Sequence, residues 1–149
     1  MDKSNPEVLN TPRGFFKLMI RSMIRTDLET VVDLYTCANP FAQKREIAEW
    51  TTEWFSKLPD YQFVCIEANR IVGAISGKLN RTGIGVVNDV AVLPEHRGRN
   101  IGSKLLKRLL SAFEQDGIKK QELMVFWPNA AAVPLYYRFG FKLKRVGHT

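Results

Sequence analysis

The most constraining feature of this sequence is a segment in which a strand pattern changes to a helix pattern across a short basic loop. Residues 84–93 form an apolar run with a polar interruption at Asn88-Asp89, and Pro94 ends it. Such a run is typical of a buried strand. A helix is predicted from Asn100 to Gln115, because leucines recur there at helical spacing and Gly117 follows as a helix C′ residue.

The other periodic segments predict a sheet around this unit. Strands are expected at 15–24, 63–67, 71–79, 123–127 and 141–146, and helices after Thr26 or Asp27, at 42–57 and at 130–138. Strands and helices do not alternate strictly, so we expect an α+β (mixed α/β) domain built on one sheet. In the helix at 42–57, the predicted apolar stripe is Ile47, Trp50, Trp54 and Phe55. The last three side chains fill the core or line a groove.

Composition sets the broad class. The chain has 149 residues, of which 45% are hydrophobic and 25% charged, as in a globular domain. We expect a tail over residues 1–13, which lack apolar periodicity, and one domain over 14–149. No run approaches the ~20 apolar residues of a membrane span. Cys37 and Cys65 form no disulfide framework or metal motif, so we expect reduced thiols and a cytoplasmic location.

The net charge of +7 points to a polyanionic partner. The loop before the predicted helix offers one place for it, because Arg97 and Arg99 flank Gly98 and a helix N-terminus has unpaired N–H groups. This combination suits a pyrophosphate, although solvated arginines are an alternative. The loop lacks the Gly-Lys-Ser/Thr of a P-loop and the three-glycine spacing of a dinucleotide fingerprint. Nucleic acid is disfavoured, because no reader motif appears.

The same loop resembles the acetyl-CoA loop of the GNAT acetyltransferase superfamily, whose pattern is Gln/Arg-x-x-Gly-x-Gly/Ala. Arg97 fills its first position and Gly102 its last, while Asn100 replaces the first glycine. Asn tolerates a left-handed conformation better than most residues, or it caps the helix instead. Residues 24–34, 71–75 and 129–141 resemble the opening strand and helix, the central hairpin and the second cofactor region of the family. The resemblance implies a central mixed sheet flanked by helices, and acetyl-CoA as co-substrate.

The resemblance also implies a set of cofactor-binding positions. In the family, the strand before the loop splays from its neighbour and pairs with the pantetheine arm, and the loop N–H groups hold the pyrophosphate. Asn129 either contacts the cofactor arm or caps the last helix. The implied residues are Val90, Ala91, Val92, Arg97, Gly98, Arg99, Asn100, Ile101, Gly102, Ser103 and Asn129.

Two catalytic residues follow from the resemblance. Tyr136 matches a family tyrosine that donates a proton to the departing thiolate, with core packing as its alternative. Met124 stands where several relatives have a glutamate base, so the base is sought elsewhere. Asp89 either accepts the amine proton or makes a structural hydrogen bond at a strand bulge. Glu67 is a second candidate for the base, although the preferred interpretation is that it lies on an exposed face of its strand.

The leading hypothesis is an acetyl-CoA-dependent N-acetyltransferase that acts on a primary amine of a small molecule or peptide. The alternative is a non-catalytic acyl-CoA-binding or regulatory module. His96 is expected to be solvated and Cys65 to be a buried, inert thiol. The chain ends eight residues after Phe141, short of the family's last strand, so we hypothesise a homodimer that completes the sheet. No metal site is expected.

Overall fold

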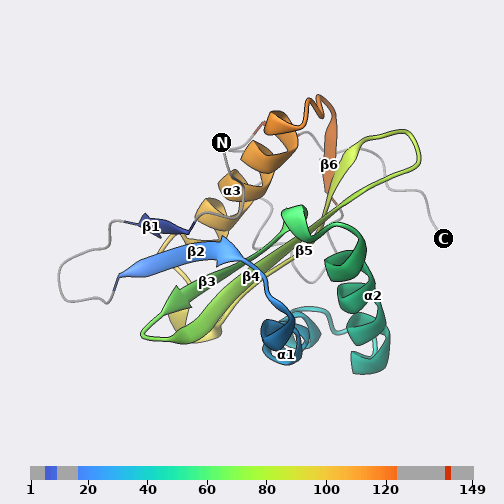
Figure 1. Cartoon of the computed structure of the whole chain (residues 1–149). Helices are drawn as coiled ribbons and strands as arrows, with labels where there is room; N and C mark the ends of the chain where they lie inside the picture. Colours follow the sequence, from blue (N-terminus) through green and yellow to red (C-terminus); the bar gives the residue numbers. More distant parts are fainter. Residues whose placement is uncertain (1–5, 10–16, 124–139, 142–149) are drawn as a thin grey trace.

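A computed structural model of the chain describes residues 6–9, 17–123 and 140–141. Its centre is a mixed sheet whose strands lie side by side in the order of the chain (Figure 1). Neighbouring strands are antiparallel except for the last pair, β5 and β6, which is parallel. The strands are β1 Glu7–Leu9, β2 Leu18–Ser22, β3 Gln62–Glu67, β4 Arg70–Leu79, β5 Gly85–Val92 and β6 Gln121–Leu123. This confirms the predicted single mixed sheet.

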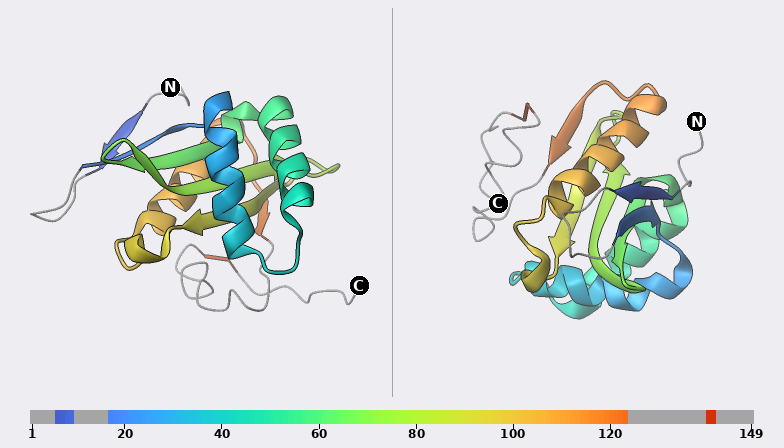
Figure 2. Two further views of the ribbon diagram at one scale, coloured as in Figure 1. Left: turned by 90° about the horizontal axis from the view of Figure 1, so that it is seen from below. Right: turned by 90° about the vertical axis from the view of Figure 1, so that its left-hand side faces the viewer.

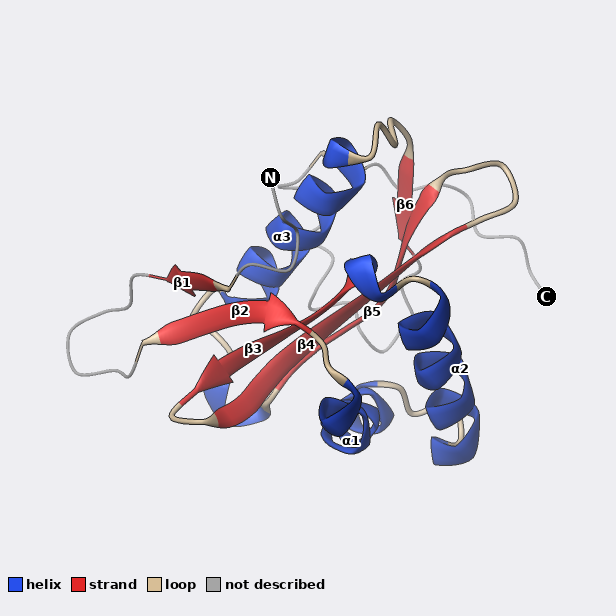
Figure 3. Cartoon of the chain, viewed as in Figure 1, coloured by secondary structure: helices blue, strands red, loops and turns tan. Residues whose placement is uncertain are grey.

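Helices cover both faces of the sheet. Helices α1 Leu28–Ala38 and α2 Lys44–Lys57 lie on one face, and α3 Ile101–Gln115 lies on the other (Figures 2 and 3). The predicted boundaries of α3 and of the C-terminal end of α2 agree with these bounds to within one residue. At the end of α3, Ile118 donates to the carbonyl of Phe113 and Gly117 to that of Glu114, with Gly117 at φ +74°. This is the Schellman ending that the glycine predicts.

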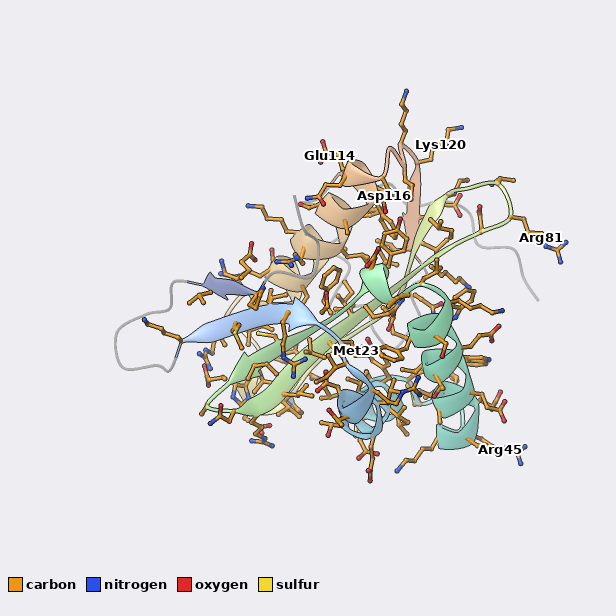
Figure 4. The ribbon with its side chains drawn as sticks, viewed as in Figure 1. Met23, Arg45, Arg81, Glu114, Asp116 and Lys120 are labelled. Atoms are coloured by element: carbon orange, nitrogen blue, oxygen red, sulfur yellow. The ribbon has the colours of Figure 1, made fainter. Side chains whose placement is uncertain are left out.

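The α3 face of the sheet is apolar and tightly packed. Leu105, Leu109 and Phe113 are fully buried against it. A Cβ built on Gly77 would lie 2.7 Å from Leu109 Cδ1, and one on Gly85 would lie 2.9 Å from the Phe113 ring. The helix therefore sits close to the strands only because these positions have no side chain. Asp116, labelled in Figure 4, lies just beyond the helix and accepts a hydrogen bond from the Tyr61 hydroxyl.

The opposite face is covered by α1 and α2 through a second apolar cluster. Val31, Tyr35 and Ile47 are buried in it. The expected place of Trp50 in this core is wrong, because its side chain is 41% exposed. One residue further on, Thr51 is 3% exposed and turns inward. The inward row of α2 therefore runs Ile47–Thr51, one turn apart, and leaves Trp50 at the surface.

Two short segments complete the sheet. Ala68 and Asn69 join β3 to β4 with φ of +50° and +61°, the left-handed geometry of a tight hairpin turn. Within the segment predicted as a tail, Glu7–Leu9 forms β1 and pairs with Leu18–Ile20 of β2. Backbone pairing accounts for this strand, since Val8 is 62% exposed and buries little apolar surface. Periodicity in side-chain polarity gives no signal for such a strand.

Candidate functional site

The loop between β5 and α3 presents backbone donors at a helix start. Asn100, the N-cap residue, has φ +62° and ψ +21°, and its side chain makes no capping hydrogen bond. Of the two alternatives for Asn100, the structure shows the left-handed backbone and not the side-chain cap. Lys104 is the first residue of α3 whose N–H reaches a backbone carbonyl, that of Asn100, at 3.0 Å. The preceding N–H groups, those of Ile101, Gly102 and Ser103, have no acceptor within the helix.

The space outside this turn is open among the described residues. Gly98 has φ +81°, and a Cβ added there would meet none of their atoms within 4 Å. Arg97 is exposed, and its Nε donates to the carbonyl of Val92 at 3.4 Å, back at the end of β5. Small residues, a left-handed turn and uncapped donors fit an anionic diphosphate, because nothing on the loop competes for the N–H groups of the first helical turn.

Arg99 differs from the sequence-based expectation. Its guanidinium is paired with the carboxylate of Glu67 through two hydrogen bonds, one of them from Nη1 to Oε1 at 3.0 Å. Glu67 is only 8% exposed, so the preferred exposed-face interpretation of this residue is wrong. His96 is not solvated either: its side chain is 14% exposed and its Nε2 lies 3.3 Å from Glu67 Oε1. The Arg99 hydrogen bond lowers the pKa of Glu67.

Strand β5 leads into this loop, and among the described residues one of its two edges is only partly paired. Val90, Ala91 and Val92 pair with Ile75, Ala74 and Gly73 of β4. On the other side, the described pairing with β6 covers Gly85–Val87 only. Val90 and Val92 pack against the α3 core, and Ala91 is buried on the α1/α2 face. Their side chains therefore belong to the core, as expected, and any contact with a ligand falls to their backbone.

Asp89 sits at a β-bulge. Ser76 pairs with Asp89 and Gly77 with Val87, so Asn88 is the extra residue on β5. Asn88 Nδ2 donates to Asp89 Oδ2 at 3.2 Å. Burial raises the pKa of Asp89 from 3.8 to about 7, although the positive charge of Lys78 opposes the rise. A carboxyl group with this pKa exchanges protons near neutral pH, as a general base must.

A buried hydroxyl pair beside Asp89 was missed by the sequence-based reasoning. The Tyr35 hydroxyl and Ser76 Oγ lie 2.8 Å apart, and both residues are 1% exposed. Burial raises the pKa of Tyr35 well above its usual value, and the charge of Asp89 adds to the rise. Nearby, Lys78 Nζ lies 5.4 Å from the centre of the Trp54 ring. A tyrosine on the inward row of α1 facing a serine on β4 is the pattern that signals such a pair.

The remaining sequence-based candidates divide in two. Tyr136, Asn129 and Met124 lie outside the described residues. Cys65 is fully buried, and burial raises its thiol pKa to about 12, which confirms an unreactive thiol. Among the residues that the structure describes, no group of three His, Cys, Asp or Glu side chains could hold a metal ion. Within the same residues, none of the helices has the length and apolar content that a membrane crossing requires.

Comparison with known proteins fits this geometry. A model of the Acetyltransferase (GNAT) family matches residues 28–141. The chain belongs to the GNAT family. The matched range begins at the first residue of α1 and includes the bulge, the C-terminal part of β5 and the loop before α3. The GNAT loop is thus the segment on which the left-handed Asn100 and the uncapped N–H groups lie.

Several relatives and solved structures resemble this GNAT chain. An uncharacterised N-acetyltransferase of Methanocaldococcus jannaschii is 27% identical over 85% of this chain and 62% of its own. N-alpha-acetyltransferase 30 of Schizosaccharomyces pombe is 30% identical over 56% and 58%. The chain therefore spans about three-fifths of the length of these curated relatives.

Solved structures share the fold. An aminoglycoside N-acetyltransferase in complex with CoA has a TM-score of 0.75 at 18% identity, over 94% of this chain and 97% of that one. Ard1 from Thermoplasma volcanium has a TM-score of 0.76 at 22% identity, over 86% and 84%. At these identities the likeness establishes the fold of the domain alone.

Proposed function

We propose that the chain is an acetyl-CoA-dependent N-acetyltransferase that moves an acetyl group directly to a primary amine. The observation that carries the proposal is the start of α3, where the left-handed Asn100 leaves the N–H groups of Ile101, Gly102 and Ser103 without capping partners among the described residues. In a GNAT chain these donors, with those of Gly98, Arg99 and Asn100, suit the pyrophosphate of acetyl-CoA. Arg97 adds positive charge at the exposed side of the loop.

Acetyl-CoA, when bound, supplies the thioester whose acetyl group passes to the amine as the carbon–sulfur bond breaks. The backbone of Val90, Ala91 and Val92 lies on the edge of β5 that the described residues leave partly paired, and it would hold the pantetheine arm by hydrogen bonds. Asn129, outside the described residues, is proposed to contact the same arm. The Arg99 side chain contributes through Glu67 and not as a free positive charge.

Asp89 is proposed as the general base. Its carboxylate accepts the proton that the amine nitrogen loses as the nitrogen–carbon bond forms, directly or through one water. Tyr136, outside the described residues, is proposed to donate its hydroxyl proton to the departing thiolate sulfur. One proton thus leaves the amine and one reaches the sulfur.

The acceptor class is drawn from the relatives. An aminoglycoside N-acetyltransferase and N-alpha-acetyltransferases are among the proteins that this chain resembles. We propose an amine of a small molecule or of a peptide. Asp89, Lys78 and Trp54 lie on the side of the sheet that α1 and α2 cover, which is where we place the acceptor.

The test measures binding and turnover separately. Calorimetry with acetyl-CoA is expected to give saturable binding, and a screen of amine acceptors that follows release of the free thiol is expected to find turnover. Asp89→Asn should lower kcat/KM about 10²-fold, and the rise of wild-type kcat/KM with pH should be centred near pH 7. Asp33→Asn, which removes an exposed carboxylate paired with Lys44, is the matched control and should change kcat/KM less than twofold.

Three outcomes separate the possibilities. No binding of acetyl-CoA would refute the proposal. Binding without thiol release on any amine would instead favour the non-catalytic acyl-CoA-binding module. Turnover that Asp89→Asn leaves unchanged would keep the activity and reject Asp89 as the base.

We also propose a cytoplasmic location and a homodimer. Cys37 is exposed and Cys65 buried, and both are free thiols, which is typical of a reducing compartment. Among the described residues, β1 is the last strand on its side of the sheet, and a free strand edge can pair with a second chain. Sedimentation at micromolar concentration tests the dimer, and a purely monomeric profile would reject it.

A further inference from the structure

Glu67 connects the β3–β4 hairpin to the loop before α3. It is the last residue of β3 and lies beside the left-handed turn at Ala68–Asn69. Both of its partners, Arg99 and His96, belong to the connection between β5 and α3. All three side chains are nearly buried, with exposures of 9% for Glu67 and 14% for each partner. The ion pair therefore links parts of the chain that are 32 residues apart.

The geometry of the contact between Arg99 and Glu67 fixes both the position and the orientation of the loop. Arg99 donates from both terminal nitrogens to the two oxygens of Glu67. A planar guanidinium held at two points fixes orientation as well as distance. Asn100, with its left-handed backbone, follows directly, and α3 begins one residue later. The direction in which the first N–H groups of α3 point therefore depends on where Glu67 holds Arg99.

A weaker contact joins the same two regions at the surface. Arg70 Nη2 lies 3.5 Å from Glu95 Oε1, and these side chains are 62% and 55% exposed. Exposed ion pairs of this kind contribute little to stability, because water screens the attraction between the two charges. The exposed Arg70–Glu95 pair therefore offers a matched control for the buried contacts of Glu67.

We propose that Glu67 is a positioning residue for cofactor binding, and that it acts through Arg99 and His96 to hold the loop N–H groups in place for a diphosphate. The inference rests on the proposed function. It also assigns Arg99 an anchoring role in place of direct phosphate binding. The lowered pKa of Glu67 is consistent with this, since the carboxylate stays charged in the pair across the neutral pH range.

The two roles for Arg99 predict opposite effects of Glu67→Gln. If Glu67 positions the loop, removing its charge releases Arg99 and His96, and the Kd for CoA should rise about tenfold. If Arg99 binds phosphate itself, removing its competitor frees the guanidinium, and CoA should bind more tightly. Arg99→Gln should raise the Kd by a similar factor. The double variant should bind CoA no more weakly than either single variant, because both substitutions break the same contact between Arg99 and Glu67.

The experiment is calorimetric titration of the purified chain with CoA. Misplacement of the loop raises the Kd, whereas simple loss of folded protein lowers the binding stoichiometry and leaves the Kd unchanged. This readout separates a positioning role from general structural damage. Glu95→Gln makes the same change of charge in the same connection, at the exposed pair, and should alter the Kd less than twofold.

A second variant covers the case in which Glu67→Gln does not fold. Arg99→Lys keeps a cation beside Glu67, so no buried charge is left unpaired, but it loses the two-point contact. Its Kd for CoA should rise several-fold.

The outcomes distinguish this inference from the proposed function. If the wild-type chain does not bind CoA, the proposed function fails, and this inference fails with it. If the wild-type chain binds CoA and both Glu67→Gln and Arg99→Lys bind it equally well or more tightly, the proposed function stands and the positioning role is overturned.

Discussion

The two faces of the sheet differ in what lies between sheet and helix. On the α3 face, Leu109 and Phe113 pack directly against Gly77 and Gly85, and these contacts are apolar. On the α1/α2 face, an equally covered surface contains the hydroxyl pair of Tyr35 and Ser76 and, beside it, Asp89. One face therefore stabilises the fold by close packing. The other holds Asp89, whose pKa of about 7 lets it exchange protons near neutral pH.

The comparison teaches where each kind of substitution should act. Changes of volume should matter most on the α3 face, because close-packed interiors respond to a single methyl group. Changes of charge and hydrogen bonding should matter most on the α1/α2 face, where desolvation sets the pKa of Asp89.

The largest expected effect is that of Phe113→Ala. The ring is fully buried, so its removal leaves a cavity and should lower the free energy of unfolding by about 4 kcal/mol. Urea denaturation measures the change. Trp50→Ala, which removes a large side chain that is 41% exposed, is the control and should cost less than about 1 kcal/mol. Equal losses in the two variants would show that the α3 face is not the tighter of the two.

The next effect is that of Gly85→Ala. The added Cβ would meet three atoms of the Phe113 ring at 2.9 to 3.0 Å, and a buried ring has no room to retreat. We expect a loss of about 2–3 kcal/mol in the free energy of unfolding, again by urea denaturation. In a Phe113→Ala background the same substitution should cost little. Additive losses would mean that the ring is not what excludes the methyl group.

On the other face, Asp89→Asn should stabilise the chain at high pH. The pKa of Asp89 is about 7 in the folded chain and 3.8 in a reference peptide. Between these values only the folded state keeps the proton, so unfolding releases a proton and wild-type stability falls as pH rises from about 4 to 7. Above pH 7 the Asp89 carboxylate is charged in the folded chain as well, so the free energy of unfolding is lowered by the full cost of burying that charge. The variant should therefore be more stable than wild type at pH 8, by roughly 2 kcal/mol.

Thermal or urea denaturation at pH 5 and pH 8 checks this prediction. Asp33→Asn serves again as the control, because its carboxylate is exposed and should give the wild-type dependence on pH. A wild-type chain whose stability, relative to Asp89→Asn, does not change between the two pH values would contradict the raised pKa.

The smallest expected effect is that of Tyr35→Phe. It leaves the buried Ser76 hydroxyl without its tyrosine partner and should lower the free energy of unfolding by about 1 kcal/mol. Ser76→Ala in addition should recover part of the loss, because no donor or acceptor of the pair then remains unsatisfied. A double variant that loses as much as the two single variants together would indicate that each hydroxyl has a different main partner.

Elements with local signals were predictable from the sequence. Gly117 marks the end of α3, and Pro94 lies two residues after Val92, the last residue of β5. The expected loop after β5 lies where the motif placed it, and Asn100 has the left-handed backbone that its side chain tolerates. Each of these depends on interactions among residues within a few positions of one another.

What the sequence did not predict depends on distant contacts. Glu67 was expected on an exposed strand face and His96 in a solvated loop, and both are instead nearly buried together with Arg99, which is 32 residues from Glu67. The predicted orientation of α2 was wrong at Trp50, since Thr51 occupies the inward position. A helix with four large apolar residues can be rotated in more than one way, and only the surface that it meets decides between them.

The order of strands in the sheet matches their order in the chain, and this has a consequence for folding. Strands β3, β4 and β5 are successive hairpin neighbours, so their pairing closes only short loops. Parallel pairing of β6 with β5 must wait until α3 has crossed between them. We therefore expect the three-stranded meander to form first and the β5–β6 pair to form late. During synthesis the bulge at Asn88 and the adjoining Asp89 would be in place before the helix that follows them has left the ribosome.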